Sequence, residues 1–439
     1  MNRSAAAFLV ASFLVCACTK GGGNIATDRL SIALPINPTQ LNGILAQNSS
    51  ENFVDGLIYS LLVTIDENGN QVPDLAEAVP TQRNGGISKN GLTVTYHLRK
   101  NVKWHDGVPF TSKDVQFTWA AIMNPQNNVI SRHGFDQVAS VQTPDDFTVV
   151  FHMKRAFPPM TNIVFGEGDT VLRILPQHLL AKYSSLNQIP FNSAPVGTGP
   201  YKFARWERGA QIVLAANEEY FKGAPAIKQL NLKIVLDTNT TQSQLRSHES
   251  QLGIEITAPT YAQLANASGL TRQLVPSPAY ESVLLNTARP PLDDVRVRRA
   301  IGLAIDRRSL IETDTHGIGT LAVADLSPFY RSAFDPGLKP LPYDPTQARQ
   351  LLEAAGWKPG ADGIRVKNGQ RLSLQFVYGQ GSDSGRNASV EIQQMLKPVG
   401  IDMQFKSYDY ATLFATAQAG GILQGGKFDM SFYAWIAGA

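Results

Sequence analysis

The stretch Leu92–Gly107, LTVTYHLRKNVKWHDG, carries the clearest local pattern in the chain. Its first eight residues, Leu92–Arg99, alternate apolar and polar side chains, which predicts a strand with one buried face. Thr111-Ser112-Lys113-Asp114 then has the spacing of a helix capping box, and Asn124-Pro125 is a typical helix end. The segment therefore predicts a strand, a turn and a helix from Asp114 to Met123.

Other parts of the chain continue this mixture of strands and helices. The predicted strands are Phe147–Met153 and Ile401–Phe405. The predicted helices follow Asp293-Asp294, with an apolar face of Val297, Ile301, Ala304 and Ile305, then run from Asp344-Pro345 to Gly356, and from about 388 to 396 before Pro398. Acidic N-caps, a proline at the first helical position and a glycine stop set these bounds. The pattern predicts an α/β fold of the mixed α+β kind.

Length and composition limit the class of protein. The chain has 439 residues, of which 43% are apolar and 17% charged, with a formal charge of +3 and no block of like charges. At roughly 100–200 residues per domain, this length predicts two or three lobes. Nucleic-acid-binding proteins usually carry a clustered basic face, so we expect no nucleic-acid partner.

The N-terminus predicts export. Residues 1–17 contain one basic residue, Arg3, and an apolar run, Ala5–Val15, which is too short for a bilayer span of about 20 residues. Cys16 and Cys18 are the only cysteines, so a thiolate metal site would need distant histidines. The residues around Cys18 resemble a bacterial lipoprotein processing site. This resemblance implies that the signal peptide 1–17 is removed and that Cys18 becomes the lipidated first residue.

A lipidated N-terminus would hold the protein at a membrane. Residues 18–27 include three consecutive glycines and are expected to form a flexible tether. Several acyl chains give stable anchoring, because each buried CH₂ contributes about 0.8 kcal/mol. We therefore expect an exported protein, in the periplasm or on the outer face of the cell membrane.

Leu98–Gly107, followed by Asp114-Val115, resembles a motif of the bacterial extracellular solute-binding proteins of family 5, the lipoproteins that serve peptide and nickel ABC importers. Further stretches match in the order of that family. They are Pro195–Tyr201 with Asn217 and Tyr220, Leu285–Thr287 running into Pro291–Arg307, Tyr343–Pro345 leading to Ala355–Trp357, and Gln393 and Leu396 before Gly400-Ile401. The resemblance extends from about residue 75 to the C-terminus.

The resemblance implies a periplasmic-binding-protein-like fold of class II, in which a hinge joins two large lobes and a small lobe is added. On this basis we expect lobe I in 28–55 and 191–278, lobe II in 56–190 and lobe III in 279–439. A solute between the lobes would favour the closed state, because only that state contacts it from both sides.

The resemblance also implies a function. It implies capture of di- and oligopeptides and their delivery to an ABC permease with its ATPase, by a monomer with no cofactor, metal or catalytic residue. Candidate ligand-binding residues come from segments that face the cleft in relatives: Phe53, Tyr280, Glu281, Asn286, Tyr378, Gln380, Tyr408, Asp409 and Trp435. Tyr280 and Trp435 are the strongest candidates, and each of the aromatic residues could equally belong to a core. Arg386 could meet a ligand carboxylate.

Several matched residues are predicted to be structural. The glycines of Pro195–Tyr201 suit a turn. His105 is expected to bond locally near a turn rather than to bind a ligand. Arg296, Arg298 and Arg299 are expected to form a solvated or paired surface rather than an anion site.

The C-terminus departs from the family pattern. Phe428–Ala439 resembles a strand that in relatives continues into Asp-Pro, and the aspartate that pairs with the α-ammonium of a peptide has no counterpart. We therefore expect a truncated chain that lacks the final return to lobe I. Unpaired strand edges and uncovered apolar surface destabilise a fold, so such a chain is expected to bind weakly or to misfold.

Other classes of function stay open. Gly421–Lys427 has phosphate-loop spacing, but Phe428 stands where Ser or Thr would hold magnesium. Gly381–Gly385 lacks the central serine of a nucleophile elbow, and the seven histidines form no H-E-x-x-H pair, so an exported enzyme is disfavoured. The same scaffold could bind a nickel chelate, haem or an oligosaccharide. An anchored receptor or chaperone without a transport role is the remaining alternative.

Overall fold

The computed structural model describes residues 28–67, 69–168, 170–274, 279–325, 334–380, 383–415, 417 and 420–436. The predicted signal peptide, the tether and Cys18 lie outside these residues. Within the described ranges, every helix is too short or too polar to pass through a bilayer.

Strands and helices are interspersed along the described part of the chain. The strands are β1 (Arg29–Leu34), β2 (Val63–Ile65), β3 (Gln71–Pro73), β4 (Thr93–His97), β5 (Val138–Asp145), β6 (Thr148–Met153), β7 (Tyr201–Glu207), β8 (Gln211–Ala216), β9 (Gln229–Ile234), β10 (Leu252–Gly253), β11 (Ala279–Leu285), β12 (Lys358–Pro359), β13 (Arg365–Lys367), β14 (Gln370–Arg371), β15 (Ser373–Gly379), β16 (Asp402–Tyr408) and β17 (Met430–Ile436). The α-helices are α1 (Ser49–Ile58), α2 (Ser112–Met123), α3 (Met160–Ile163), α4 (Gln177–Leu180), α5 (Thr238–Arg246), α6 (Ala258–Gln263), α7 (Val295–Ala304), α8 (Arg307–Asp314), α9 (Pro345–Ala354), α10 (Asp383–Leu396) and α11 (Tyr410–Phe414), with short 3₁₀ turns at Phe135–Gln137, Pro190–Ser193 and Lys397–Val399.

A five-stranded sheet in the order β10-β1-β9-β8-β7 organises residues 28–274, which we call the N-terminal half. β1 lies between β10 and β9 and runs parallel to both. β7, β8 and β9 are antiparallel neighbours. The apolar residues of β1 become buried toward its end, from Ile32 to Leu34, so the chain enters this core within its first described strand.

The predicted strand, turn and helix of 92–123 are confirmed. β4 pairs with β6 in a three-stranded sheet, and Tyr96 of β4 packs edge-on against Phe151 at a ring separation of 5.8 Å. α2 begins at Ser112, because the Asp114 carboxylate accepts a hydrogen bond from the Thr111 backbone N–H at 2.9 Å. The capping pattern therefore set the helix start to within two residues.

A second sheet, in the order β11-β17-β15-β16, organises residues 279–436, which we call the C-terminal half. β15 is parallel to both β16 and β17, whereas β11 is antiparallel to β17. α10 connects β15 to β16 and buries Ala388, Ile392 and Leu396 against the sheet. The predicted helices of this half are confirmed, and Asp294 and Asp344 act as their N-caps.

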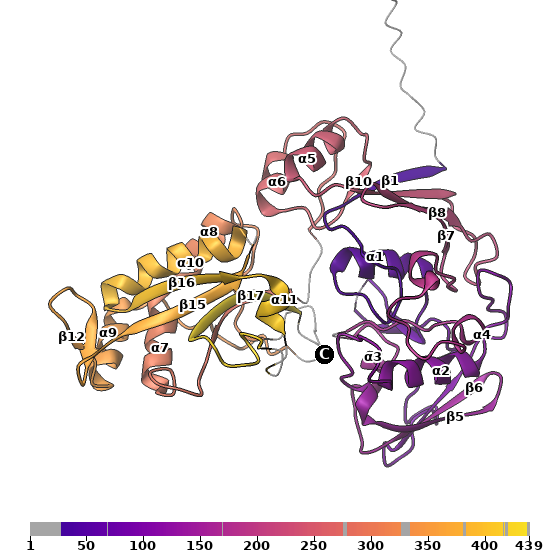
Figure 1. Ribbon diagram of the computed structural model, residues 1–439, viewed down its shortest axis with the longest axis horizontal. Coiled ribbons are helices and arrows are strands. Elements are labelled where there is room, and N and C mark those ends of the chain that lie inside the picture. Colours follow the sequence, from indigo (N-terminus) through magenta and orange to yellow (C-terminus); the bar gives the residue numbers. More distant parts are fainter. Residues whose placement is uncertain are drawn as a thin grey trace, which may run out of the picture.

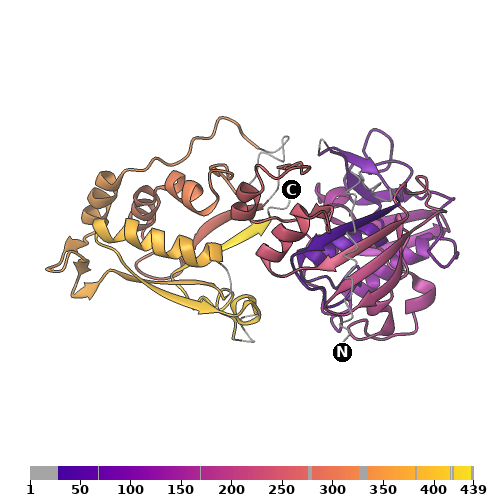
Figure 2. The same cartoon turned by 90° about the horizontal axis from the view of Figure 1, so that it is seen from above.

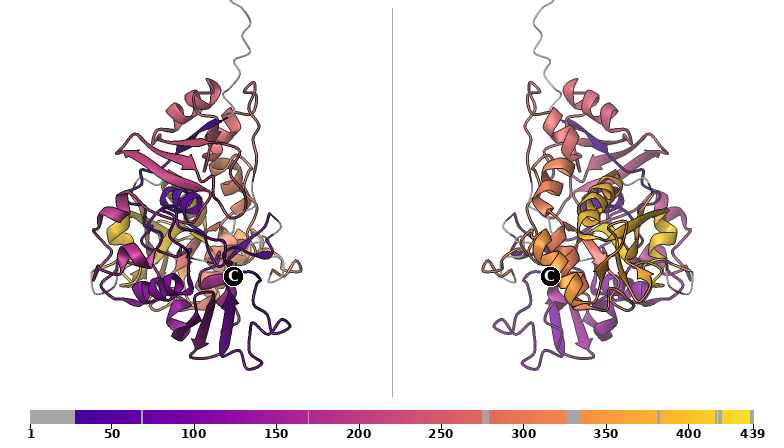
Figure 3. Two further views of the ribbon diagram at one scale, coloured as in Figure 1. Left: turned by 90° about the vertical axis from the view of Figure 1, so that its right-hand side faces the viewer. Right: turned by 90° about the vertical axis from the view of Figure 1, so that its left-hand side faces the viewer.

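The two halves have separate hydrophobic cores. Buried residues from Ile32 to Leu232 of the sequence form the first core, and buried residues from Leu292 to Met430 form the second. They lie side by side in Figure 1, and Figure 2 shows the same arrangement from above. Figure 3 shows each half in turn from its own end. The predicted mixed α/β fold is confirmed, whereas the lobe boundaries stay a prediction.

His105 joins two distant segments of the N-terminal half. Its Nδ1 accepts a hydrogen bond from the Gly197 N–H at 3.1 Å, so its Nε2 carries the proton and donates to the Gly199 carbonyl at 3.0 Å. Its own backbone N–H donates to the Gly197 carbonyl at 2.8 Å. The structural role is as predicted, but the expected local bonding is wrong, because the partners lie more than ninety residues along the chain.

Acid should weaken this junction. Burial lowers the pKa of His105 from 6.5 to about 4, so the unfolded chain takes up the proton before the folded one does. The contribution of neutral His105 to the free energy of unfolding is complete above pH 6.5. This contribution falls as the pH drops toward 4, by about 3 kcal/mol at most. Urea unfolding of the wild type and of His105→Gln at pH 7 and pH 4 measures the stability that each protein loses on acidification. An equal loss in the two proteins would contradict the assignment of this pH dependence to His105.

Candidate functional site

Aromatic side chains gather on the two strands β11 and β17. The strands pair antiparallel with Tyr280 opposite Trp435 and Ser282 opposite Tyr433. Directly paired residues share one face of a sheet, so these four side chains lie on the same face. The Tyr433 ring lies 5.9 Å from that of Trp435 and 5.3 Å from that of Phe414 in α11, both edge-on. We call Tyr280, Phe414, Tyr433 and Trp435 the aromatic row.

The aromatic row is partly open to solvent. Trp435 is 51% exposed and Phe414 is 38% exposed. Burial raises the pKa of Tyr433, and the neighbouring Tyr280 raises it further, so the Tyr433 hydroxyl stays neutral at physiological pH. Neighbouring exposed aromatic rings are typical of binding surfaces, since they offer large apolar area at little cost in conformational entropy.

The row lies at one edge of the C-terminal sheet. β15, β16 and β17 are parallel, so their carboxyl ends, at Gly379, Tyr408 and Ile436, meet at the same edge, where β11 begins. Ligands of open α/β sheets bind outside the carboxyl ends of the strands. In Figure 2 the arrowhead of β17 points toward the N-terminal half, so this edge faces the other half of the molecule.

Gln380, Tyr408 and Asp409 occupy the same edge. The Gln380 backbone N–H donates to the Tyr408 carbonyl at 2.7 Å, which ties the ends of β15 and β16 together. Asp409 caps α11, where its carboxylate accepts from the Thr412 backbone N–H at 2.9 Å. Asp409 thereby holds the helix that brings Phe414 to the aromatic row.

Glu281 and Tyr378 lie on the opposite face of the sheet. Tyr378 pairs with Phe432 and packs against the second core. Glu281 and its neighbour Tyr280 on β11 both line a pocket of about 740 Å³ together with Ile311 and Asp314, but by strand alternation their side chains leave the sheet on opposite faces. Burial raises the pKa of Asp314 to about 6, and Glu391 and Glu281 add to the effect. The structure therefore divides the predicted site between two faces.

Phe53 is the one predicted site residue in the N-terminal half. It is half-buried on α1 and packs against the first core. The structure thus groups Tyr280, Gln380, Tyr408, Asp409 and Trp435 at one edge and leaves Phe53 on a separate element.

Comparison with known proteins identifies the scaffold. The profile described as bacterial extracellular solute-binding proteins, family 5 Middle, matches residues 70–439. The chain belongs to this family. The oligopeptide-binding protein AppA of Bacillus subtilis is 27% identical over 86% of this chain and 68% of its own length. Its structure in complex with a nonapeptide superposes with a TM-score of 0.74 at 26% identity, over 93% of this chain and 79% of that one.

Nickel-binding members are similar to the same degree. The nickel-binding periplasmic protein of Escherichia coli is 28% identical over 93% of this chain and 75% of its own length. NikZ of Campylobacter jejuni, in complex with Ni(L-His), superposes with a TM-score of 0.76 at 26% identity, over 94% of this chain and 78% of that one. These relatives confirm the periplasmic-binding-protein fold for this solute-binding protein.

Asn286 has a structural role in this solute-binding protein. Its side-chain amide donates to the carbonyls of Phe428 at 2.9 Å and Gly426 at 3.2 Å. These bonds hold the loop before β17 against the end of β11. These two hydrogen bonds occupy the side-chain N–H groups that Asn286 would otherwise offer to a ligand. A ligand role for Asn286 stays a prediction.

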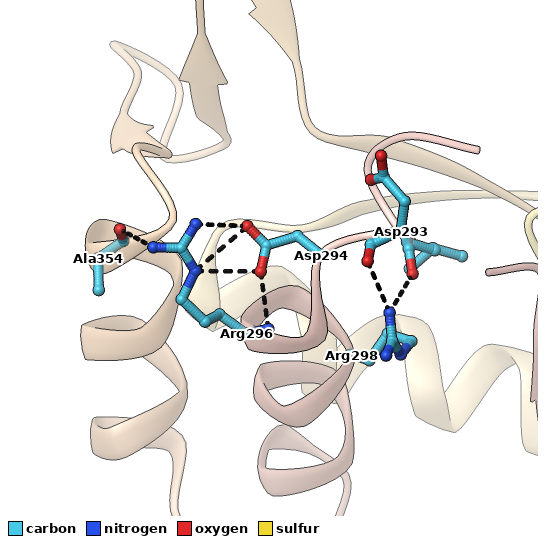
Figure 4. Close-up of polar contacts among 6 residues, drawn as sticks. Asp293, Asp294, Arg296, Arg298 and Ala354 are labelled. Carbon is cyan, nitrogen blue, oxygen red and sulfur yellow. Dashed lines mark hydrogen bonds and ion pairs between the residues drawn. The ribbon is translucent and has the colours of Figure 1, made fainter. Parts of the chain in front are cut away.

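Arg296 and Arg298 are engaged within the protein (Figure 4). Arg296 pairs with Asp294 at 2.7 Å and donates to the Ala354 carbonyl at 2.7 Å, which links α7 to α9. Arg298 donates to the carbonyls of Leu292 and Asp293 at 2.8 and 2.9 Å. The prediction of a paired surface is confirmed for these two arginines.

Tyr433 and Phe414 were missed by the sequence analysis. Tyr433 precedes Trp435 by two residues, so the alternation of a strand places both rings on one face. That signal is present in the sequence. Phe414 had no comparable signal, because α11 had to be placed before its partner could be known.

Proposed function

We propose that this protein captures short peptides between its two halves and delivers them to the permease and ATPase of an ABC importer. The aromatic row at the carboxyl edge of the C-terminal sheet is the observation that carries the proposal. Among the described residues, β11 has one strand neighbour in the sheet, β17, so its other backbone edge can pair with an extended peptide. AppA, which has the same fold, is described in complex with a nonapeptide.

The proposed ligand contacts are shared between the halves. Tyr280 and Trp435 provide apolar area, Gln380, Tyr408 and Asp409 provide polar groups at the same edge, and Phe53 contributes from α1. The weaker candidates are Glu281, Asn286 and Tyr378. Glu281 and Tyr378 lie on the face of the sheet opposite the aromatic row. The side-chain amide of Asn286 is already bonded to two backbone carbonyls.

Peptide binding can be tested on the purified protein by thermal shift with pools of di- to nonapeptides. A peptide at 100 times its Kd should stabilise the folded state by about 2.7 kcal/mol. A cooperative melt without ligand is established first, so that a misfolded protein is distinguished from a folded one that binds nothing. A folded protein that no peptide stabilises would contradict the proposal.

A nickel chelate is the second candidate ligand, because the E. coli and C. jejuni relatives are described as binding nickel or Ni(L-His). Nickel chloride with L-histidine in the same thermal-shift assay tests it. Stabilisation by the chelate and by no peptide would favour this alternative.

We further propose that the protein is exported and held at a membrane by lipid on Cys18. Labelled palmitate should be incorporated into the wild type and into Cys16→Ser, and it should be absent from Cys18→Ser. The Cys16 variant is the matched control, since it also removes one of the two cysteines. Equal labelling of both variants would contradict the assignment of Cys18.

A further inference from the structure

A carboxyl group and a guanidinium lie buried beside α1, and no ion pair joins them in the described part of the chain. Asp55 is 1% exposed, and neither of its carboxylate oxygens has a hydrogen-bond partner among the described residues. Arg173 is 8% exposed, and its buried Nε likewise lacks a partner within the described part of the chain. Buried polar groups are nearly always hydrogen-bonded, so an adjacent pair of unpartnered ones needs an explanation.

Two glycines provide the space that Arg173 occupies. A Cβ at Gly43 would lie 2.8 Å from the Arg173 Cβ, and a Cβ at Gly56 would lie 3.2 Å from Arg173 Nη2. The Arg173 backbone N–H also donates to the Gly43 carbonyl at 2.8 Å. The guanidinium is therefore placed over Gly56, the residue directly after Asp55 on α1.

The other polar groups around Asp55 are already engaged. The Glu51 carboxylate, one turn earlier on α1, accepts from the Thr39 backbone N–H and hydroxyl and from the Gln47 N–H, each at 2.7 Å. The Tyr59 hydroxyl, one turn later, donates to the Leu41 carbonyl at 2.9 Å. Arg173 and Glu51 are the charged groups that act on Asp55, and of these only Arg173 attracts the carboxylate.

Burial favours the protonated form of such a carboxyl group. It raises the pKa of Asp55 to about 8, against the opposing attraction of Arg173. The neutral acid leaves its polar atoms unsatisfied, but it can stay apart from the guanidinium at a much smaller cost than a charged group could. The ionised carboxylate cannot, because an unpaired charge in this environment is far more costly than a paired one.

We propose that Asp55 and Arg173 form a proton-controlled latch between α1 and the segment 171–175. While Asp55 holds its proton, the two side chains stay apart, as they do in this structure. When the proton passes to solvent, the carboxylate forms an ion pair with the guanidinium and fixes α1 against this segment. Phe53 lies on the same helix, so solute affinity would change with the latch; this consequence alone rests on the proposed function.

A double-mutant cycle at two pH values tests the latch. Unfolding equilibrium constants are measured in urea for the wild type, Asp55→Asn, Arg173→Met and the double variant. The coupling between the two positions should be at least tenfold at pH 9 and less than twofold at pH 6. The exposed ion pair Lys103–Glu219, at 3.1 Å, is the control, and its coupling should be the same at both pH values.

A coupling between Asp55 and Arg173 that is equal at pH 6 and pH 9, or absent at pH 9, would overturn the proposal. If a variant fails to fold, carbon-13 NMR of the wild-type aspartate carboxyls decides. The Asp55 signal should titrate with a midpoint between pH 7 and 9, together with a shift of the Arg173 Nε signal. A midpoint below pH 6, or an Arg173 signal that does not follow it, would also overturn the proposal.

Discussion

Replacing Gly197 with alanine should destabilise the protein by more than about 3 kcal/mol, a large part of the roughly 5–15 kcal/mol that holds a domain folded. A Cβ at this position would lie 1.9 Å from the Ile58 carbonyl oxygen and 2.7 Å from the Ile58 carbonyl carbon. Backbone atoms cannot turn away as a flexible side chain can. The His105 bonds to both the N–H and the carbonyl of Gly197 further restrict relaxation.

Gly209→Ala is the matched control for this prediction. Gly209 has a φ of +73°, but a Cβ there would meet nothing within 4 Å. Its cost should be limited to the left-handed backbone strain of about 1–2 kcal/mol. Urea unfolding of both variants gives the comparison. An equal loss of stability in the two variants would show that the close approach of Gly197 to Ile58 does not exclude a Cβ atom.

Replacing Trp435 with alanine should weaken peptide binding at least thirtyfold, or about 2 kcal/mol, and leave the stability nearly unchanged. The side chain is 51% exposed, so its removal costs little buried area. Its ring contacts Tyr433, and it lies opposite Tyr280 on the paired strand. A ligand at the carboxyl edge would therefore lose the largest apolar surface offered to it.

Tyr343→Ala provides the control for aromatic loss. Tyr343 is 53% exposed but lines a groove with Pro345 and Met395, outside the aromatic row. Calorimetric titration of one bound peptide against both variants measures the difference. A Trp435 variant with unchanged affinity, or a Tyr343 variant with an equal loss, would remove the aromatic row from the site.

Local signals in the sequence predicted the elements well. The helix starts at Asp294 and Asp344 depend on a side chain bonding to a backbone N–H two or three residues ahead. At α2 the bond runs in the opposite direction, since the Asp114 carboxylate accepts from the Thr111 backbone N–H three residues earlier, and these bounds too could be read without knowing the rest of the fold. The fold class followed from the order of such elements together with the family motifs.

Contacts between distant residues could not be predicted in the same way. Tyr280 and Trp435 were each chosen as candidates, but their direct pairing depends on the register of two strands separated by about 150 residues. Glu281, by contrast, could have been placed on the opposite face from the sequence, because adjacent residues of a strand point to opposite faces. The partners of His105 and the meeting of Asp55 with Arg173 likewise arise only when remote segments pack together.

Small-angle X-ray scattering with and without a saturating peptide tests the central claim most directly, namely that one solute is held by both halves. The account predicts that the radius of gyration decreases when a peptide identified by thermal shift is added, and that Trp435→Ala needs a higher peptide concentration for the same decrease. Binding with an unchanged radius of gyration would contradict capture between the halves.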